Sequence, residues 1–234
     1  MVRHRKQFTF GVVLSLSFFV ILGVMFQPYF GGENAFHAAD RLFSQISKGS
    51  SYFMKEMAEK SAAAKGNIVE VKLSVDSQLL QANMERILST HGVTIRREGD
   101  GLHIKGDLGT ILAAAVVDSD DMYYNRGEVV RQRYGVDERQ VLFAWWKMLS
   151  LLNKELASQK QFSWAKLVKE IQKRAVEVGY NFYGIEPKSA SEKAGILTFA
   201  LIFYVLYTVW WGYAILMLFD GIGLEMKAGA KKEV

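Results

Sequence analysis

The chain has 234 residues, of which 50% are hydrophobic and 23% are charged, and its formal net charge is +5. It contains no cysteine, which excludes a disulfide scaffold, a thiolate metal or iron–sulfur site, c-type haem attachment and a cysteine nucleophile. The hydrophobic residues are concentrated in one block near each end, a pattern typical of a membrane protein.

The first apolar block, residues 8–27, contains no charged residue and is long enough to cross the hydrocarbon core of a membrane as a helix. A basic tail, residues 1–7, precedes it, as in a secretory signal peptide. The apolar run is longer than that of most signal peptides, however, and no small-residue cleavage motif follows at 27–29. We therefore expect a transmembrane helix that is retained as an anchor.

Between the two apolar blocks, residues 28–188 are expected to form a mainly helical α+β domain outside the cytoplasm. Its first element is predicted to be a helix over 33–64, because apolar residues recur at alternating spacings of three and four. Three alternative roles fit such a helix: packing of its apolar face on its own domain, a seam with a partner helix, or a position on the bilayer surface.

A small unit of strands and helices follows in the order βαββα, which predicts an antiparallel sheet with helices on one face. Alternation of apolar and polar residues indicates the first strand, and the turn Gly99-Asp100-Gly101 indicates a hairpin between the other two. The predicted elements are a strand over 69–75, a helix over 77–90, strands over 93–97 and 102–105, and a helix over 108–117.

The rest of the domain is predicted to be two helices joined by a short connection. Asp137 and Gln140 suit the start of a helix, and a broad apolar stripe follows over 141–156. A second helix is expected over 163–178, and the short connection between the two favours an antiparallel arrangement. The segment 179–187 is expected to be a loop that leads to the second apolar block.

The second apolar block, within residues 189–219, predicts another transmembrane helix. Ser189 and Glu192 have the spacing of a capping box, so this helix is expected to begin near Ala190. Asp220 is expected to mark its other end, at the boundary between membrane and water.

Aromatic residues are frequent in the middle of this second block. Tyr and Trp prefer membrane interfaces, because their polar tips need hydrogen-bond partners that lipid tails lack. Either other transmembrane helices satisfy these tips, or the side chains line a cleft for a quinone or a lipid. A small-residue pair in the first block permits close approach of another helix. The expected membrane or partner interface is Gly11, Ser15, Phe203, Tyr204, Tyr207, Trp210, Trp211 and Tyr213.

Basic residues next to the two blocks predict the orientation of the chain. They are Arg3, Arg5 and Lys6 ahead of the first block and Lys227, Lys231 and Lys232 after the second. The tails 1–7 and 220–234 are therefore expected in the cytoplasm and the domain on the far side, which for a bacterial inner membrane is the periplasm. Basic and acidic residues nearly balance within the domain, so nucleic-acid binding is not expected.

The sequence contains no catalytic motif that we can identify. No two of its four histidines have the spacing that brings two imidazoles to one metal on a helix. Asp118, Asp120 and Asp121 are weak candidates for a metal site, but Met122 stands where a calcium loop needs an oxygen ligand. A nucleophile turn and a phosphate-binding glycine loop are also missing. We expect neither an enzyme nor a bound cofactor.

These features favour a non-catalytic accessory or structural subunit of a larger integral-membrane complex, respiratory or transport-related. Its expected partners are other integral-membrane subunits and the lipid bilayer. The alternative is a self-oligomerising envelope scaffold or transport regulator. A subunit that binds a quinone, a lipid or a metal is the third hypothesis.

Overall fold

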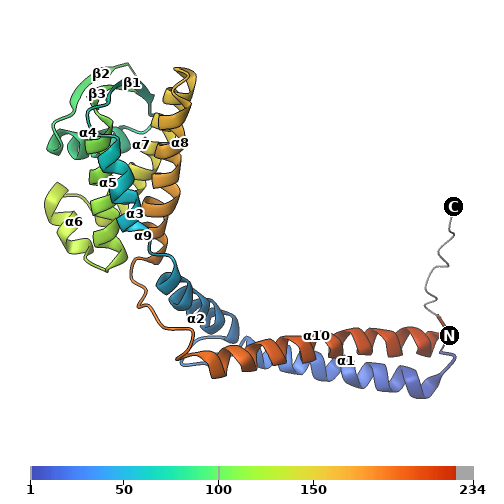
Figure 1. Cartoon of the computed structure of the whole chain (residues 1–234). Helices are drawn as coiled ribbons and strands as arrows, with labels where there is room; N and C mark the ends of the chain where they lie inside the picture. Colours follow the sequence, from blue (N-terminus) through green and yellow to red (C-terminus); the bar gives the residue numbers. More distant parts are fainter. Residues whose placement is uncertain (1, 100, 225–234) are drawn as a thin grey trace. The chain divides into compact units, whose positions relative to one another are not determined.

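The computed structural model describes residues 2–99 and 101–224. The described chain is mostly helical, with one three-stranded antiparallel sheet and two helices that are long and apolar enough to cross a membrane (Figure 1). It divides into two compact units. One contains the residues up to Ile46 and those from Lys188 onward, and the other, which we call the domain, is Ser47–Pro187.

The elements occur in the following order along the described chain. They are α1 (Arg5–Met25), α2 (Ala35–Ser50), α3 (Met54–Ala63), β1 (Ile68–Ser74), α4 (Gln78–Thr90), β2 (Thr94–Glu98), β3 (Gly101–Asp107), α5 (Leu108–Tyr123), α6 (Gly127–Tyr134), α7 (Glu138–Ser158), α8 (Phe162–Ile171), the π-helical turn η1 (Gln172–Val176), α9 (Glu177–Phe182) and α10 (Ala194–Ile222).

The two apolar helices α1 and α10 lie side by side and antiparallel, and we call this pair the helical hairpin (Figure 1). The backbone closes one end of it. The amide groups of Arg3 and His4 donate to the carbonyl oxygen of Gly221 at 2.9 and 3.0 Å. This contact ties the start of α1 to the end of α10 and satisfies donors that a helix start leaves unpaired.

The start of α10 differs from the prediction. The helix begins at Ala194 and not near Ala190, because the Ser189 hydroxyl lies 2.5 Å from the hydroxyl of Ser191 and accepts from its amide at 3.2 Å. The Ser189 side chain therefore serves a local turn, and the predicted capping box with Glu192 does not start the helix.

The single helix predicted over 33–64 is instead two helices, α2 and α3, separated by residues 51–53. The hydroxyls of Ser50 and Ser51 both donate to the carbonyl oxygen of Ser47, at 3.1 and 2.7 Å. Serine side chains that bond the backbone in this way compete with helical hydrogen bonds, and Gly49 adds conformational freedom at the same point.

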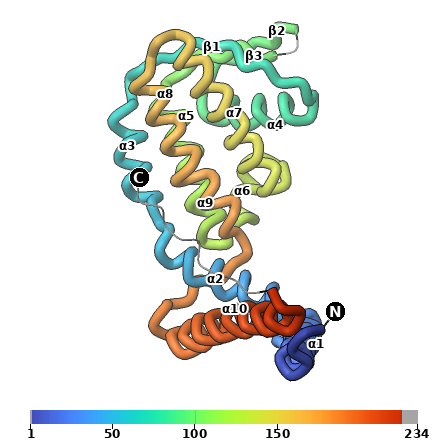
Figure 2. The backbone as a smooth tube through the Cα atoms, turned by 90° about the vertical axis from the view of Figure 1, so that its right-hand side faces the viewer, coloured from blue at the N-terminus to red at the C-terminus, as the bar shows by residue number. Residues whose placement is uncertain are grey.

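The predicted βαββα unit is confirmed, with strand order β1-β3-β2 and antiparallel pairing throughout. Alternate residues of β1 are buried, and Val71 pairs with Ile104 of β3. The Ser77 hydroxyl caps α4 by accepting from the amide of Leu80. Asp100, in the predicted turn between β2 and β3, lies outside the described residues. The sheet covers one end of the helices of the domain (Figure 2).

The predicted pair of helices in the domain is also confirmed, as α7 followed by α8. The Asp137 carboxylate begins α7 by accepting from the amides of Arg139 and Gln140 at 3.1 and 3.2 Å. The second helix continues to Phe182, beyond the predicted end at residue 178. Gly179 does not end it, because this glycine faces α5, where an added Cβ would lie 2.6 Å from the Ser119 carbonyl oxygen.

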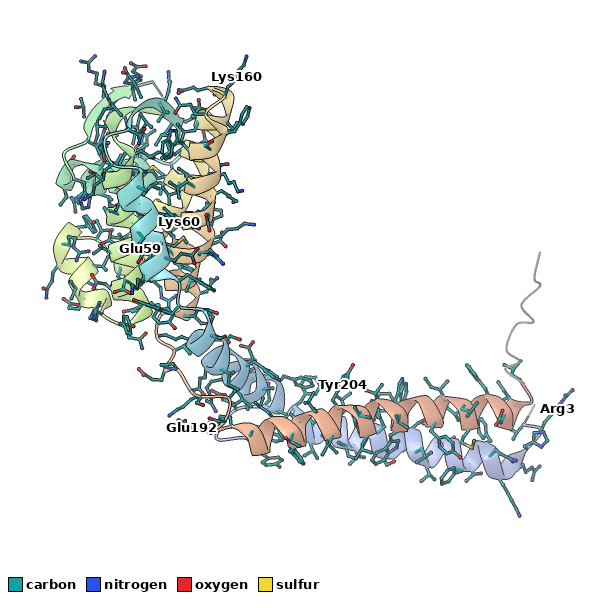
Figure 3. The ribbon with its side chains drawn as sticks, viewed as in Figure 1. Arg3, Glu59, Lys60, Lys160, Glu192 and Tyr204 are labelled. Atoms are coloured by element: carbon teal, nitrogen blue, oxygen red, sulfur yellow. The ribbon has the colours of Figure 1, made fainter. Side chains whose placement is uncertain are left out.

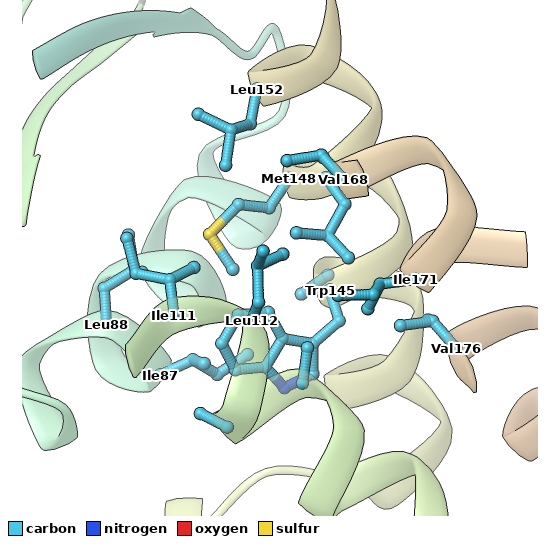
Figure 4. Packing of buried hydrophobic residues seen from close by; sticks show 14 of the residues in the cluster. Ile87, Leu88, Ile111, Leu112, Trp145, Met148, Leu152, Val168, Ile171 and Val176 are labelled. Atoms are coloured by element: carbon cyan, nitrogen blue, oxygen red, sulfur yellow. The ribbon is translucent and has the colours of Figure 1, made fainter. Parts of the chain in front are cut away.

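The core of the domain is built around Trp145 of α7, whose side chain is fully buried (Figure 4). Residues from four other elements surround it. The neighbours labelled in Figure 4 are Ile87, Leu88, Ile111, Leu112, Met148, Leu152, Val168, Ile171 and Val176. At the surface, Lys60 of α3, labelled in Figure 3, forms an ion pair with Glu170 of α8 at 2.6 Å.

Candidate functional sites in the hairpin and the domain

Glycine allows the two helices of the hairpin to approach closely. A Cβ on Gly11 would lie 2.8 Å from the Leu218 amide nitrogen, and one on Gly221 would lie 2.6 Å from the Phe8 Cα. Gly11 is therefore used for packing within the chain. The Ser15 hydroxyl donates to the Gly11 carbonyl oxygen of its own helix at 2.9 Å.

Two polar aromatic tips of α10 are satisfied by the backbone of α1. The Tyr207 hydroxyl donates to the Phe18 carbonyl oxygen at 3.0 Å, and the Trp210 indole donates to the Leu14 carbonyl oxygen at 3.1 Å. The Phe18 ring stacks on Tyr207 at 4.1 Å between centroids and also contacts Trp211 at 4.6 Å. The structure thus places these three α10 residues against α1 of the same chain.

The other predicted interface residues of α10 face outward to different degrees. Phe203 is half-buried and stacks on Tyr207 at 5.3 Å between ring centroids. Tyr204, labelled in Figure 3, is 68% exposed, and Tyr213 is 48% exposed. Within the described residues, neither of these two hydroxyls has a hydrogen-bond partner.

Asp118 is the centre of a buried polar cluster in the domain, which we call the buried network. Its carboxylate is fully buried and accepts from the Tyr134 hydroxyl and the Trp145 indole, both at 2.7 Å. It also forms an ion pair with Arg133. Burial raises the pKa of Asp118, while the three donors act to lower it. The network joins α5, α6 and α7, so it fixes the positions of three helices.

The three aspartates proposed as weak metal ligands are each engaged by neighbouring side chains, and Asp121 shares one arginine with Asp118 and another with Asp120. Asp121 forms ion pairs with Arg133 and Arg126, each at 3.0 Å. Asp120 accepts from the Tyr52 hydroxyl at 2.9 Å and forms an ion pair with Arg126 at 3.3 Å. Among the residues that the structure describes, no group of three or more histidine, aspartate or glutamate side chains could hold a metal ion.

The position of Asp118 in the sequence could have indicated that its carboxylate is buried. It lies on the buried stripe of α5, where the other positions are Leu108, Ile111, Leu112, Ala115, Ser119 and Met122. A carboxylate on such a stripe predicts a buried partner of opposite charge. Spacing alone could not identify Arg133, because α6 is a separate helix whose direction depends on tertiary packing.

His91, at the end of α4, connects the buried network to the surface. Its Nε2 atom lies 2.9 Å from the Tyr134 hydroxyl. A shallow pocket of about 350 Å³ opens beside it. The lining residues are Lys65, His91, Thr110, Ala113, Ala114, Val117, Asp118 and Arg133. Burial lowers the pKa of His91, the Asp118 carboxylate raises it and the Arg133 guanidinium lowers it.

The lowered pKa of His91 predicts acid destabilisation. Below the ordinary value of 6.5, the unfolded chain binds a proton that the folded domain resists, so the free energy of unfolding falls as the pH falls. We expect this slope in urea titrations of the detergent-solubilised chain, and His91→Gln should reduce it. His103→Gln, a substitution on the sheet, is the control. An equal slope in the wild type and His91→Gln would contradict the prediction.

Lys48 is a second buried charged residue of the domain, in the last turn of α2. Its ammonium donates to the carbonyl oxygens of Phe182 and Ile185 at 3.0 and 2.5 Å and to the Asn125 side chain at 3.3 Å. Burial lowers the pKa of Lys48, and the charge of Glu186 raises it. The three contacts hold the segment after α9 against the end of α2.

Lys48→Ala is expected to lower the free energy of unfolding by about 1–3 kcal/mol, since it leaves buried acceptors without a donor. Urea unfolding of the detergent-solubilised chain, followed by circular dichroism, measures the loss. Lys55→Ala, at an exposed position of α3, is the matched control and should change stability little. Equal stability of the two variants would show that the Lys48 contacts do not stabilise the domain.

Four exposed side chains of α7 and α9 form two pairs, which we together call the aromatic patch because Arg139, Phe143 and Trp146 lie on one face of α7. Phe143 and Trp146 stack at 6.1 Å between centroids, and they are 48% and 37% exposed. The Arg139 guanidinium lies 5.8 Å from the centre of the Tyr180 ring. Trp, Tyr, Phe and Arg are enriched in protein–protein interfaces, so the patch has the chemistry of a contact surface.

Comparison with known proteins identifies no relative. No protein-family model matches the chain, and no curated protein or solved structure does either.

Proposed function

We propose that the chain is a non-catalytic accessory subunit of a larger integral-membrane complex, respiratory or transport-related. In this proposal the helical hairpin spans the inner membrane, both tails lie in the cytoplasm and the domain is periplasmic. The observation that carries the proposal is the exposure of the Tyr204 and Tyr213 side chains on the hairpin, whose hydroxyls have no hydrogen-bond partner among the described residues.

These two tyrosines lie at levels of the hairpin that would be inside the hydrocarbon core of the membrane. Trp210 bonds to Leu14, next to the midpoint of α1, and so marks the middle of the helix pair. At 1.5 Å per residue, Tyr213 lies about 5 Å and Tyr204 about 9 Å from that level. Both distances are within the half-thickness of a hydrocarbon core, about 15 Å.

A phenol hydroxyl at that depth has a strong requirement for a partner. Leaving it unpaired in hydrocarbon costs on the order of 2 kcal/mol or more. The hairpin satisfies Tyr207 and Trp210 internally. Tyr204 and Tyr213 are exposed, and although the edge of the Tyr213 ring contacts Phe10 of α1 at 6.4 Å between centroids, neither hydroxyl has a hydrogen-bond partner among the described residues. A helix of another membrane subunit would supply acceptors for them and cover the outward face of α10.

The aromatic patch supports the same proposal from the domain. Exposed aromatic side chains next to an arginine are typical of the residues that contribute most to binding between proteins. A subunit held by the membrane hairpin and by a soluble contact would have two attachment points. Linking two contacts in one chain raises the overall affinity without requiring either contact to be strong.

Photo-crosslinking in native membranes tests the proposal. A benzoylphenylalanine placed at Tyr204 or Tyr213 is expected to form adducts with a different integral-membrane protein. The same residue at Tyr207, which faces α1, is the control and should give no such adduct. Self-adducts alone would overturn the proposal in favour of a self-oligomerising scaffold or transport regulator. Absence of any protein adduct at both positions would also overturn it.

A further inference from the structure

We infer that α2 lies in the interface between lipid headgroups and water, with Phe36 and Phe43 inserted toward the acyl chains. The inference rests on the proposed insertion of the hairpin and adds a second surface of contact with lipid. It concerns residues 35–46, the part of α2 that belongs to the same compact unit as α1 and α10.

The residues of α2 are segregated between two faces. At 100° per residue, one side of the helix is apolar and the opposite side is polar, the pattern of helices that lie in the plane of a membrane interface. The apolar side consists of Phe36, Ala39, Leu42, Phe43 and Ile46, and the polar side includes His37, Arg41, Ser44 and Gln45.

The two phenylalanines of the apolar side are exposed. Phe36 is 44% exposed and Phe43 is 53% exposed. They are seven residues apart, which places them on one side of the helix about 10 Å from each other along its axis. Exposed phenylalanines at this spacing form an apolar face that another apolar surface would contact. The position of α2 in the chain indicates whether that surface is protein or lipid.

Continuity with the end of α1 favours lipid as the cover. Phe36 contacts Phe26, one residue beyond α1, at 5.0 Å between ring centroids. In the connection to α2, Tyr29 is 73% exposed and Phe30 is 42% exposed. Exposed aromatic residues concentrated at the end of a span are typical of the membrane interface. The first turns of α2 therefore begin where a headgroup region would lie.

The charges of α2 indicate insertion without selection for anionic lipid. Arg41 forms an ion pair with Glu33 at 2.7 Å, and Asp40, the preceding residue of α2, adds a negative charge. A helix bound by electrostatic attraction to anionic lipid carries an excess of lysine and arginine on its polar face, which this part of α2 lacks. We therefore expect the contact in zwitterionic bilayers as well.

The absence of cysteine from the sequence makes a direct test possible. Single-cysteine variants of the full chain, Phe36→Cys and Phe43→Cys, are labelled with the environment-sensitive fluorophore NBD and placed in phosphatidylcholine nanodiscs. Their matched neighbours are His37→Cys and Ser44→Cys, each displaced by one residue and hence by 100° around the helix. Val20→Cys, an exposed position within α1, reports insertion of the hairpin itself.

Nitroxide-labelled phosphatidylcholine, with the quencher at the top of the acyl chain, is expected to quench Phe36→Cys and Phe43→Cys at least about twofold more than their neighbours. Equal quenching within each pair would overturn the inference. A blue-shifted fluorophore that lipid does not quench would overturn it too, because protein would then cover this face. If a quencher deep in the bilayer fails to reach Val20→Cys, the proposed insertion of the hairpin fails as well.

Discussion

Asp118→Ala is expected to lower the free energy of unfolding of the domain by about 3–5 kcal/mol. The substitution leaves three donors without their shared acceptor, namely the Tyr134 hydroxyl, the Trp145 indole and the Arg133 guanidinium. Removing one partner of a buried ion pair costs far more than the pair itself contributes, because the remaining charge stays partly buried.

Urea unfolding of the detergent-solubilised chain, followed by near-ultraviolet circular dichroism, measures this loss. Asp118→Asn keeps the shape of the side chain and should lose less stability than the alanine variant. Glu128→Gln, which removes an ion pair at a 62% exposed carboxylate, is the control and should change stability by about 1 kcal/mol or less. A loss at Asp118→Ala no larger than that at Glu128→Gln would show that the buried network does not hold the domain together.

Gly221→Leu is expected to weaken the association of α1 with α10 along the whole hairpin, because it disrupts the end that the backbone closes. The added side chain would start 2.6 Å from the Phe8 Cα, a main-chain atom that cannot move without displacing α1. Overpacking of this kind costs about 1–3 kcal/mol. It also displaces the Gly221 carbonyl oxygen from the amide groups of Arg3 and His4.

Fluorescence energy transfer between the two helices measures the separation. Fluorophores are attached to cysteines at Val20 and Val205, both exposed, and the detergent mixture is titrated with dodecyl sulfate. Gly212→Leu is the matched control on α10, since nothing lies within 4 Å of a Cβ added there. We expect Gly221→Leu to separate at a lower fraction of dodecyl sulfate than Gly212→Leu. The same midpoint for both would contradict the packing described for Gly221.

The local patterns of the sequence predicted most of the helices and strands. Alternation in β1, the serine cap at Ser77 and the aspartate cap at Asp137 each depend on residues close in the chain. The predicted helix ends were wrong where a residue contacts another helix of the fold, or where its side chain bonds to a different neighbour in the chain. Gly179 resembles a helix end but faces α5, and Ser189 resembles a cap but bonds to Ser191.

The candidate sites were less accessible to sequence reasoning for the same physical reason. The aromatic content of α10 correctly indicated that Tyr207 and Trp210 need hydrogen-bond partners. No spacing rule indicates that α1 supplies them, because the acceptors are backbone carbonyl oxygens, which every residue has. In the domain, the three aspartates looked like one cluster in sequence, whereas Asp118 and Asp120 have different partners.

Purification of the chain from its native membranes in a mild detergent tests the proposed function most directly. Mass spectrometry of the purified material identifies the proteins that accompany it and their stoichiometry. The proposal predicts one or more multi-span membrane subunits in fixed ratio to this chain, and their loss when Tyr204 and Tyr213 are both replaced by leucine. A chain that is recovered alone as a monomer, or only with copies of itself, would contradict the proposal.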